Sequence, residues 1–545
     1  MALSRLAGDA KVTDRRLAVI WVCAVVRLGF YAAMLPLWEG FDEWGHFAVI
    51  RSVASGQALP SRAAALQPDI ESSLQQAPVP WEMRNMPAPF ATQDAYWAFS
   101  AEQRQDREIA FARRSAAPNL VAMTQYEALQ APLYYWLMAP VMWLLGGLGL
   151  AVQVMVLRWL SVLIAACTIP LIYAIGREIF DDLELALGCA AVTALMPEFA
   201  LDVARVANDC LAVPLFTLVI YLGLRILRLG LSYRRAAWLG LALGAGLLTK
   251  AYFLSALPGV AVLLAHEVWR GQKKLPPALL AGAASVAVAG WWYARNLFTT
   301  GTLAGLSEAV QLRQTGWLAT LQAAARISWP KAIDSVLLSH IYFGAWSSMT
   351  VRSWIYHLLY GVALAGVIGL AREIRRPGIW WLLIVYIGFW VGQSYNIVLL
   401  FLAKGVPTSM GWYLYAVVGA EVTLCVAGLQ RWIGRWAILL GTVLFALLDL
   451  YTVNVVAMPY YTGMIRHRAN GTLEAMQIAK LGGLGLDGVF GRLAIYKAPL
   501  VLPSIVAALW VAYVSATVWL AVASAGRSPN SCATQSISSP PPKPV

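Results

Sequence analysis

Charged residues are scarce in this chain. They make up 13% of its 545 residues, whereas hydrophobic residues make up 60%. Soluble domains usually carry about 25% charged and 45–50% apolar residues. The apolar residues here fall in blocks of roughly 17–22, about the length that a helix needs to cross a bilayer core. The composition therefore excludes an ordinary soluble domain and predicts an all-α polytopic membrane protein.

Motifs for metal and nucleotide binding are also missing. The six cysteines are scattered, with neither the spacing of a metal site nor that of a disulfide framework. The five histidines form no H-x-x-x-H or H-x-x-E-H pattern, so a zinc cage built by the protein alone is not expected. There is no Gly-rich phosphate loop of the soluble nucleotide-binding kind. A strong internal repeat, which many transporter folds show, is absent as well.

Positive charge is present and is concentrated between the apolar blocks. The net charge is +13, and most basic residues lie in short loops, where they mark the cytoplasmic side of a membrane protein. This placement argues against nucleic acid as a partner. The basic segments are 225–235, 270–274, 372–377 and 431–435, together with Lys11, Arg15 and Arg16 near the N-terminus.

From these loops we predict about 12 spans, within a range of 11–13, and cytoplasmic termini. The spans are approximately 17–36, 157–176, 185–201, 209–227, 236–249, 252–268, 276–296, 353–371, 378–399, 411–429, 434–455 and 500–522. The block 131–149 contains Pro132 and Pro140 among Tyr and Trp residues. We expect it to lie as an amphipathic helix at the outer interface, because counting it as a span inverts every later loop.

The chain is divided by these spans into four parts. The predicted parts are a cytoplasmic segment 1–16, a transmembrane module 17–300 that includes an outer loop 37–156, a second transmembrane region 301–523 with outer loops 297–352 and 456–499, and a disordered cytoplasmic tail 524–545. The three outer loops are too short for independent domains, so we expect them to form a cap over the helices.

An acidic pair, Asp42–Glu43, follows the first span, and His46 comes one turn later. Asp42 and His46 are four residues apart and share a helix face. Capping of a helix N-terminus would explain one acid. It does not explain the aromatic residues around the pair, which hold it at the lipid boundary. A carboxylate held there is a candidate general base for a hydroxyl or amine.

Five segments resemble one family in the same order. They are FDEWGHFAVIRSVASGQALP, YEALQAPLYYWLMAP, RVANDCLAVPLFTLVIYL, LLTKAYFLSALP and GWWYARNLFTTGTL. Over roughly 17–300, the chain is similar to the C-type (GT-C) integral-membrane glycosyltransferases, which include protein O-mannosyltransferases and the lipid A aminoarabinose transferase. The resemblance implies transfer of a sugar from a polyprenyl-phosphate donor to a lipid, glycan or protein acceptor. It places the enzyme in the inner cell membrane, among membrane lipids, with the site on the extracytoplasmic face.

The resemblance also implies roles for individual acids. Asp42 acts as the base or orients the acceptor, with Glu43 and His46 in support, and Asp209 is a second acid that positions the acceptor or a metal. A divalent cation that bridges Asp42, Asp209 and the donor phosphate stays open, because hard cations favour carboxylate and phosphate oxygens. The first outer loop supplies further candidates for the acceptor and the sugar, namely Glu127, Gln130, Tyr134 and Tyr135.

Basic residues on the outer side are candidates for the donor phosphate, whose charge must be stabilised as its bond to the sugar breaks. They are Lys250, Arg295, Arg205 and Lys404. The alternative for each is that it only anchors a helix end. The family often has G-R-Y-L in a later segment, where this chain reads GWYLY. Trp412 replaces that arginine, and Lys404 is the candidate to supply its charge.

Arg27 is different because it lies in the middle of the first span. Charges inside the membrane face the bundle interior and pair with another group. We expect a structural pair with Glu198 or Glu421. The alternative to a transferase is a flippase for lipid-linked sugars or a secondary transporter. A transporter predicts ionisable groups near the membrane centre, whereas the acids here cluster in an outer loop.

Overall fold

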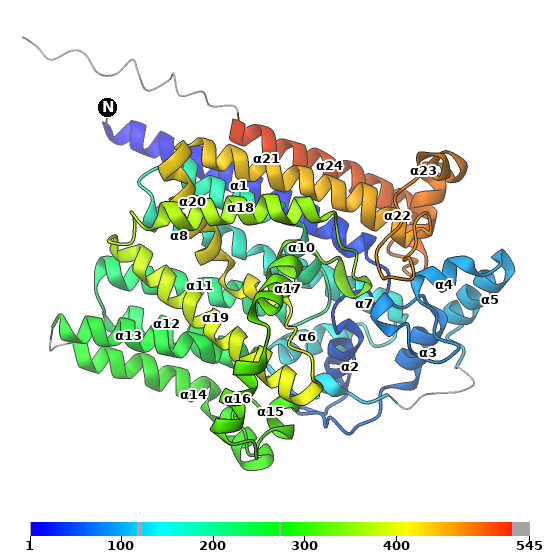
Figure 1. Cartoon of the computed structure of the whole chain (residues 1–545), viewed down its shortest axis with the longest axis horizontal. Helices are drawn as coiled ribbons and strands as arrows, with labels where there is room; N and C mark the ends of the chain where they lie inside the picture. The colour runs from blue at the N-terminus through cyan, green and yellow to red at the C-terminus, as the bar shows by residue number, and fades with distance from the viewer. Residues whose placement is uncertain (1, 117–122, 272–273, 526–545) are drawn as a thin grey trace, which may run out of the picture.

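Long apolar helices dominate the computed structural model, which describes residues 2–116, 123–271 and 274–525 (Figure 1). Ten helical segments are long and apolar enough to cross a membrane, and a bent pair raises the number to 11. No strand occurs in these described ranges, where only isolated bridges form. The prediction of an all-α polytopic membrane protein is confirmed, with slightly fewer spans than the 12 expected.

The ten candidate spans are formed by single helices or by helices that continue one another. They are α1 (Ala2–Met34), α7 (Leu150–Ala166) with α8 (Thr168–Ile179), α11 (Asp209–Leu229), η3 (Ala251–Ser255) with α13 (Ala256–Trp269), α14 (Leu275–Thr300), α18 (Ser353–Leu370), α19 (Pro377–Lys404), η6 (Gly411–Val417) with α20 (Val418–Ile433), α21 (Trp436–Tyr451) with η7 (Thr452–Ala457) and α22 (Met458–Tyr461), and α24 (Pro503–Ala525).

Two predicted spans have a different form. The segment 185–201 is split into α9 (Leu183–Leu195) and α10 (Pro197–Val203), which are bent by 66°. Pro197 begins α10, and a proline cannot continue the hydrogen bonding of the preceding helix. The segment 236–249 forms α12 (Tyr233–Leu247), a helix of 15 residues that lies against α14. Fifteen residues of helix extend only about 22 Å, which is less than a usual span.

Most of the remaining helices form a cap at one end of the bundle, on the right of Figure 1, and a smaller group lies at and below its centre. Those of the first loop are α2 (Glu43–Ala54), α3 (Pro68–Gln76), η1 (Trp81–Met83), α4 (Gln93–Ala98), α5 (Ala101–Ala112), η2 (Tyr126–Leu129) and α6 (Leu133–Leu144). Later loops add α15 (Ser307–Gln311), α16 (Trp317–Arg326), α17 (Trp329–Ile341), η5 (Ala345–Ser347) and α23 (Ile478–Ala494). α6 has only 12 residues, in agreement with the prediction that 131–149 does not cross the membrane.

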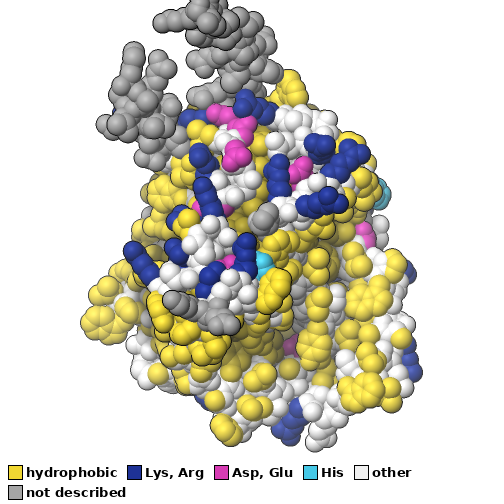
Figure 2. Space-filling model, turned by 90° about the vertical axis from the view of Figure 1, so that its left-hand side faces the viewer, with side chains coloured by type: hydrophobic (Ala, Val, Ile, Leu, Met, Phe, Trp, Pro, Cys, Tyr) yellow, Lys and Arg dark blue, Asp and Glu magenta, His cyan; other side chains and the backbone are white. Residues whose placement is uncertain are grey.

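Basic side chains gather at the opposite end of the bundle, which faces the viewer in Figure 2. Ion pairs link the helix ends there: Arg16 to Glu184 at 2.6 Å, Arg435 to Asp182 at 2.8 Å, and Arg228 to Glu178 at 3.1 Å. The start of the first span therefore lies beside the turn between α8 and α9, which Arg435 also contacts. The predicted tail starts within α24 and from residue 526 lies outside the described residues.

Arg27 has a different partner from the two that we predicted. It forms a fully buried pair with Asp449 of α21, with 2.6 Å between guanidinium and carboxylate. Glu198 instead accepts the backbone N–H groups of Phe343 and Gly344. The prediction was wrong because a single sequence does not reveal which helices are neighbours, and α1 lies against α24, which lies against α21.

Candidate active site

Asp42 is the N-cap residue of α2 and has a left-handed backbone conformation, with φ of 55°. Its Oδ1 accepts a hydrogen bond of 2.6 Å from the Tyr126 hydroxyl. The residue is partly exposed, and within the described ranges it has no ion pair. Burial of the carboxyl raises the pKa of Asp42, although the Tyr126 hydroxyl and the charges of Arg205 and Lys250 oppose this shift.

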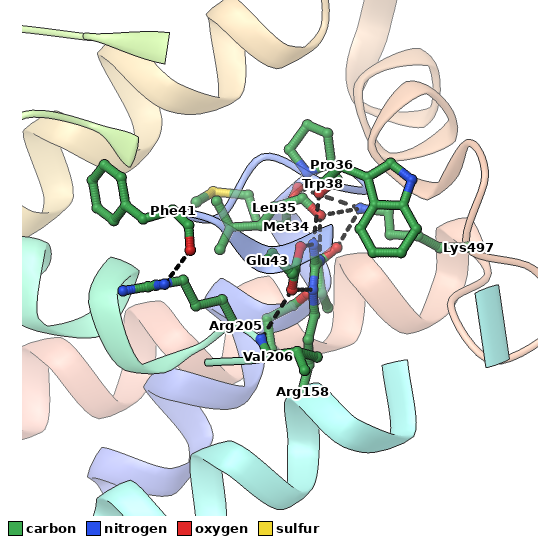
Figure 3. A network of polar contacts seen from close by, with 12 residues as sticks. Met34, Leu35, Pro36, Trp38, Phe41, Glu43, Arg158, Arg205, Val206 and Lys497 are labelled. Atoms are coloured by element: carbon green, nitrogen blue, oxygen red, sulfur yellow. Dashed lines mark hydrogen bonds and ion pairs between the residues drawn. The ribbon is translucent and has the colours of Figure 1, made fainter. Parts of the chain in front are cut away.

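Glu43 is the next residue, but its side chain has a separate set of partners. Both of its oxygens accept bonds from Arg158 of α7, at 2.7 and 2.6 Å, and both side chains are fully buried (Figure 3). Oε1 also accepts the backbone N–H of Val206 at 3.0 Å. Glu43 therefore ties α2 to α7 and to the turn after α10.

A row of side chains with alternating charge lies beside Asp42. Arg205 contacts Asp202 at 2.6 Å and Asp209 at 3.0 Å, and the other oxygen of Asp209 contacts Lys250 at 2.5 Å. Arg205 also donates to the backbone carbonyl of Phe41. The sequence places Asp202, Arg205 and Asp209 three and four residues apart, so the two turns around the start of α11 bring their side chains together.

The Arg205 side chain packs closely against Gly40, and this allows it to reach the Phe41 carbonyl. A Cβ atom at Gly40 would lie 2.7 Å from Cβ of Arg205, which is closer than side chains can approach. Glycine at this position therefore allows the guanidinium to reach the carbonyl that precedes Asp42. This small residue was not singled out in the sequence, although it stands two positions before the acidic pair.

His46 and Glu127 form a second group beside α2, within reach of the same charges. His46 Nδ1 is 2.8 Å from the Tyr135 hydroxyl, and Nε2 is 3.8 Å from Glu127 Oε2. Burial lowers the pKa of His46 well below its usual value, and the charges of Arg205 and Lys250 lower it further. Burial, followed by the charge of Asp42, raises the pKa of Glu127 to about 8. Both groups are therefore largely uncharged at neutral pH.

Aromatic rings from η6 complete the cluster. Trp412 stacks on Phe41 with ring centroids 3.7 Å apart, and the Lys250 ammonium lies 5.3 Å from the centre of the Tyr413 ring. The position at which the family often has arginine thus faces the residue before Asp42, and in this chain it contributes an aromatic surface instead of a charge.

Three of the other predicted site residues make their contacts elsewhere. Lys404 pairs with Glu308 at 2.8 Å, and its side chain is 59% exposed. Arg295 lies 5.0 Å from the ring of Trp292. Tyr134 shares a hydrogen bond of 3.1 Å with Ser161. The Gln130 backbone N–H donates to the Glu127 carbonyl at 3.0 Å, so Gln130 lies next to the group around His46.

Sequence reasoning missed three contributors to this cluster. Arg158 stands at the start of a predicted span and was not singled out, although a buried arginine needs a partner, which here is Glu43. Asp202 could have been recognised from the sequence, because an acid three residues before Arg205 is placed to pair with it on a helix. Tyr126 stands next to Glu127 in the quoted YEALQ segment, but nothing in the sequence indicated that its hydroxyl reaches Asp42.

The arrangement does not fit a resident divalent cation between Asp42 and Asp209. Both oxygens of Asp209 already contact cationic side chains, and one oxygen of Asp42 accepts from Tyr126. Within the described residues, no group of three or more His, Cys, Asp or Glu side chains is placed to hold a metal ion.

A cavity of about 600 Å³ occurs at the basic end of the bundle rather than here. Arg16, Glu184, Asp182 and Arg435 line its polar part. It is remote from Asp42, so the candidate site is defined by its cluster of ionisable groups and not by this cavity.

Comparison with protein families matches part of the chain. Residues 129–293 match the model of the dolichyl-phosphate-mannose-protein mannosyltransferases. The segment is under a third of the chain, and it contains Arg158, Asp202, Arg205, Asp209 and Lys250. No curated protein matches the chain.

Solved structures show remote likeness. One is ArnT from Cupriavidus metallidurans bound to undecaprenyl phosphate, with 16% identity, a TM-score of 0.38, and coverage of 88% of this chain and 76% of that one. Another is the Archaeoglobus fulgidus oligosaccharyltransferase in complex with Zn and sulfate, with 14% identity, a TM-score of 0.40, and coverage of 78% of this chain and 51% of that one. TM-scores of this size do not bear on function. The match over 129–293 confirms the resemblance to the C-type glycosyltransferases, and with it the prediction of a glycosyltransferase.

Proposed function

We propose that the chain transfers a sugar from a polyprenyl-phosphate donor to an acceptor at the extracytoplasmic face, with Asp42 as the base or acceptor-orienting group. The observation that carries the assignment of Asp42 is its difference from the neighbouring acids. Glu43 and Asp209 are buried and bound to cations on both oxygens. Asp42 is partly exposed, has no ion pair in the described ranges and has a raised pKa, as suits a group that accepts a proton.

The reaction assigns a task to each charge. Asp42 takes the proton from an acceptor hydroxyl or amine as its oxygen or nitrogen forms the new bond to the anomeric carbon of the sugar. The bond between that carbon and the phosphate oxygen breaks, and the electron pair leaves with the polyprenyl phosphate. Arg205 and Lys250 stabilise the charge that develops on the phosphate. Asp209 holds both cations in place before the substrate arrives.

Neutral groups then contact the acceptor and the sugar. His46, Tyr135 and Glu127 form a set of donors and acceptors that carries little net charge at neutral pH. Such a set suits hydroxyl groups better than it suits phosphate. Trp412 and Tyr413 offer aromatic faces beside the cations, on which a sugar ring can stack.

The sidedness follows from the distribution of charge. Lys and Arg gather on the end of the bundle that Figure 2 shows, whereas α2, which Asp42 precedes, lies at the other end in Figure 1. Basic residues in short loops mark the cytoplasmic face. The cap that contains α2 then lies on the extracytoplasmic side of the inner membrane, where donor and acceptor meet.

A transfer assay separates this function from lipid flipping or transport. Radiolabelled mannosyl or aminoarabinosyl undecaprenyl phosphate is supplied to membranes that contain the protein, and label is followed in lipid, glycan and protein fractions. A transferase forms a covalently labelled acceptor. Movement of labelled donor between leaflets without any labelled acceptor would contradict the proposal and favour a flippase.

A further inference from the structure

The end of α1 is held by two buried basic side chains from distant parts of the chain. The last carbonyl groups of a helix have no partner within the helix. Here Arg158 donates to the carbonyls of Ala32, Leu35 and Pro36 at 2.7–3.0 Å. Lys497 donates to those of Ala33, Met34 and Leu35, at 2.5, 3.3 and 3.3 Å. The carbonyls of five consecutive residues are thus all bonded (Figure 3).

Lys497 differs from Arg158 in its lack of a counterion. Arg158 is paired with Glu43, whereas Lys497 has no ion pair within the described residues. It is 1% exposed, and burial lowers its pKa well below the usual value. In place of a carboxylate, its amine contacts the carbonyl groups at the negative end of the α1 dipole. A lysine buried at such cost points to a specific task at this helix end.

The segment that follows this helix end carries Asp42. It contains two residues other than glycine with positive φ, Trp38 at 67° and Asp42 at 55°. Each such residue costs about 1–3 kcal/mol and persists only where its surroundings fix the backbone. The far end of the segment is fixed by Arg205 at Phe41 and by Glu43. The near end is fixed by Arg158 and Lys497.

We propose that Lys497, from the segment after α23, is a positioning residue for Asp42. It holds the end of α1, and through it the loop from Leu35 to Asp42, in the geometry that the transfer step needs. This inference rests on the proposed function. It also means that an outer loop from the C-terminal region completes a site whose charged residues come from the first half of the chain.

The test compares three variants of the full-length protein. Lys497→Met removes the donors, and Lys497→Arg retains charge and donors. Lys480→Met is the matched control, because Lys480 donates to the Met464 carbonyl at 2.9 Å in the same outer loop but is 43% exposed. Transfer from the radiolabelled undecaprenyl-phosphate sugar gives kcat and the KM for donor separately. Monodispersity in detergent shows that each variant is folded.

A positioning role predicts that Lys497→Met lowers kcat about 10- to 100-fold, since small displacements of reacting groups have effects of this size. The donor KM is expected to stay within about twofold, and Lys497→Arg and Lys480→Met are expected to be close to wild type. Unchanged kcat in Lys497→Met, a parallel rise in KM, or no rescue by arginine overturns the inference.

Two further outcomes are also decisive. If Lys497→Met is not monodisperse, Lys497→Gln replaces it, and failure of both to fold makes Lys497 a folding residue and overturns the inference. Asp42→Asn is measured in parallel. Full activity in Asp42→Asn contradicts the proposed function itself, whereas an inactive Asp42→Asn beside a wild-type Lys497→Met contradicts only the positioning role.

Discussion

The adjacent acids Asp42 and Glu43 have different surroundings in the fold. Glu43 is fully buried between Arg158 and the backbone of Val206. Asp42 lies at the surface of the cluster and is bonded to Tyr126. The two residues face different partners because Asp42 has a left-handed backbone conformation immediately before α2 begins. The pair therefore combines a candidate reactive group with its structural anchor.

Tyr126 is expected to tune the acidity of Asp42. As a base, Asp42 works only when deprotonated, so activity rises with pH through its pKa, which burial places above the usual value. The Tyr126 hydroxyl stabilises the carboxylate and lowers that pKa. Tyr126→Phe should shift the acid limb of the kcat/KM profile upward by about one pH unit. The control is Tyr96→Phe in α4, a tyrosine of the same cap whose hydroxyl donates to Glu108 at 3.1 Å. A limb that does not move, or moves down, contradicts this role.

Lys250 and Lys404 are both candidates for the donor phosphate, and substitution separates them. Lys250 belongs to the cluster and pairs with Asp209, whereas Lys404 is exposed and pairs with Glu308. Lys250→Met is expected to lower kcat about 100-fold, as does loss of a group that stabilises developing charge. Lys404→Met should have a much smaller effect. Rates measured with saturating donor decide between them, and the reverse order contradicts the assignment.

Helices were the most predictable elements. The predicted spans 353–371 and 378–399 correspond closely to α18 and α19, because a block of apolar residues of the right length leaves few alternatives in a membrane. The bend before Pro197 and the short α12 were not predicted. A proline in an apolar run either kinks a helix or starts a new one, and the sequence alone does not decide which.

Contacts between helices were much less predictable. Asp42 was a candidate base from its position after the first span, whereas Asp209 was identified as a site residue only through the family resemblance. The ion pairs that link Asp202, Arg205, Asp209 and Lys250 needed the structure. Arg27 shows the limit most clearly, since its partner Asp449 is more than 400 residues away. Periodicity locates the buried face of a helix but does not identify the helix opposite.

The Arg27–Asp449 pair is expected to stabilise the contact between α1 and the C-terminal helices. Removal of one partner from a buried pair costs about 3–5 kcal/mol. Arg27→Met should therefore lower the thermal unfolding midpoint markedly, and the double variant Arg27→Met/Asp449→Leu should recover most of the loss. The matched control is Arg16→Met, whose pair with Glu184 is partly exposed and contributes about 0–1 kcal/mol. Equal effects of Arg27→Met and Arg16→Met contradict this account.

At the level of the whole molecule, both halves of the chain meet at the candidate site. The segment matched by the family model supplies Arg205, Asp209 and Lys250. Trp412 and Tyr413 come from η6, well beyond that segment. The division into a catalytic module 17–300 and a second region 301–523 stays a prediction, but the aromatic side of the cluster depends on the second region.

The proposed orientation can be tested by labelling single cysteines in a variant without native cysteines. Glu102 is exposed in the cap, on α5, and Tyr233 is 60% exposed at the basic end. A membrane-impermeant maleimide should label Glu102→Cys in intact cells, and Tyr233→Cys only after permeabilisation. The opposite pattern would place Asp42 on the cytoplasmic side and contradict the proposed location of transfer.

The central claim is that Asp42 supports the transfer step, and the most direct measurement is the transfer rate of Asp42→Asn. The substitution keeps the size of the side chain and removes its capacity to accept a proton. The matched control is Asp69→Asn, an acid of the same cap that pairs with Arg51 and is 47% exposed. With a radiolabelled undecaprenyl-phosphate sugar, Asp42→Asn should lower kcat about 10²- to 10⁴-fold, with donor binding and the control unchanged. A rate for Asp42→Asn equal to that of the wild type would contradict the account.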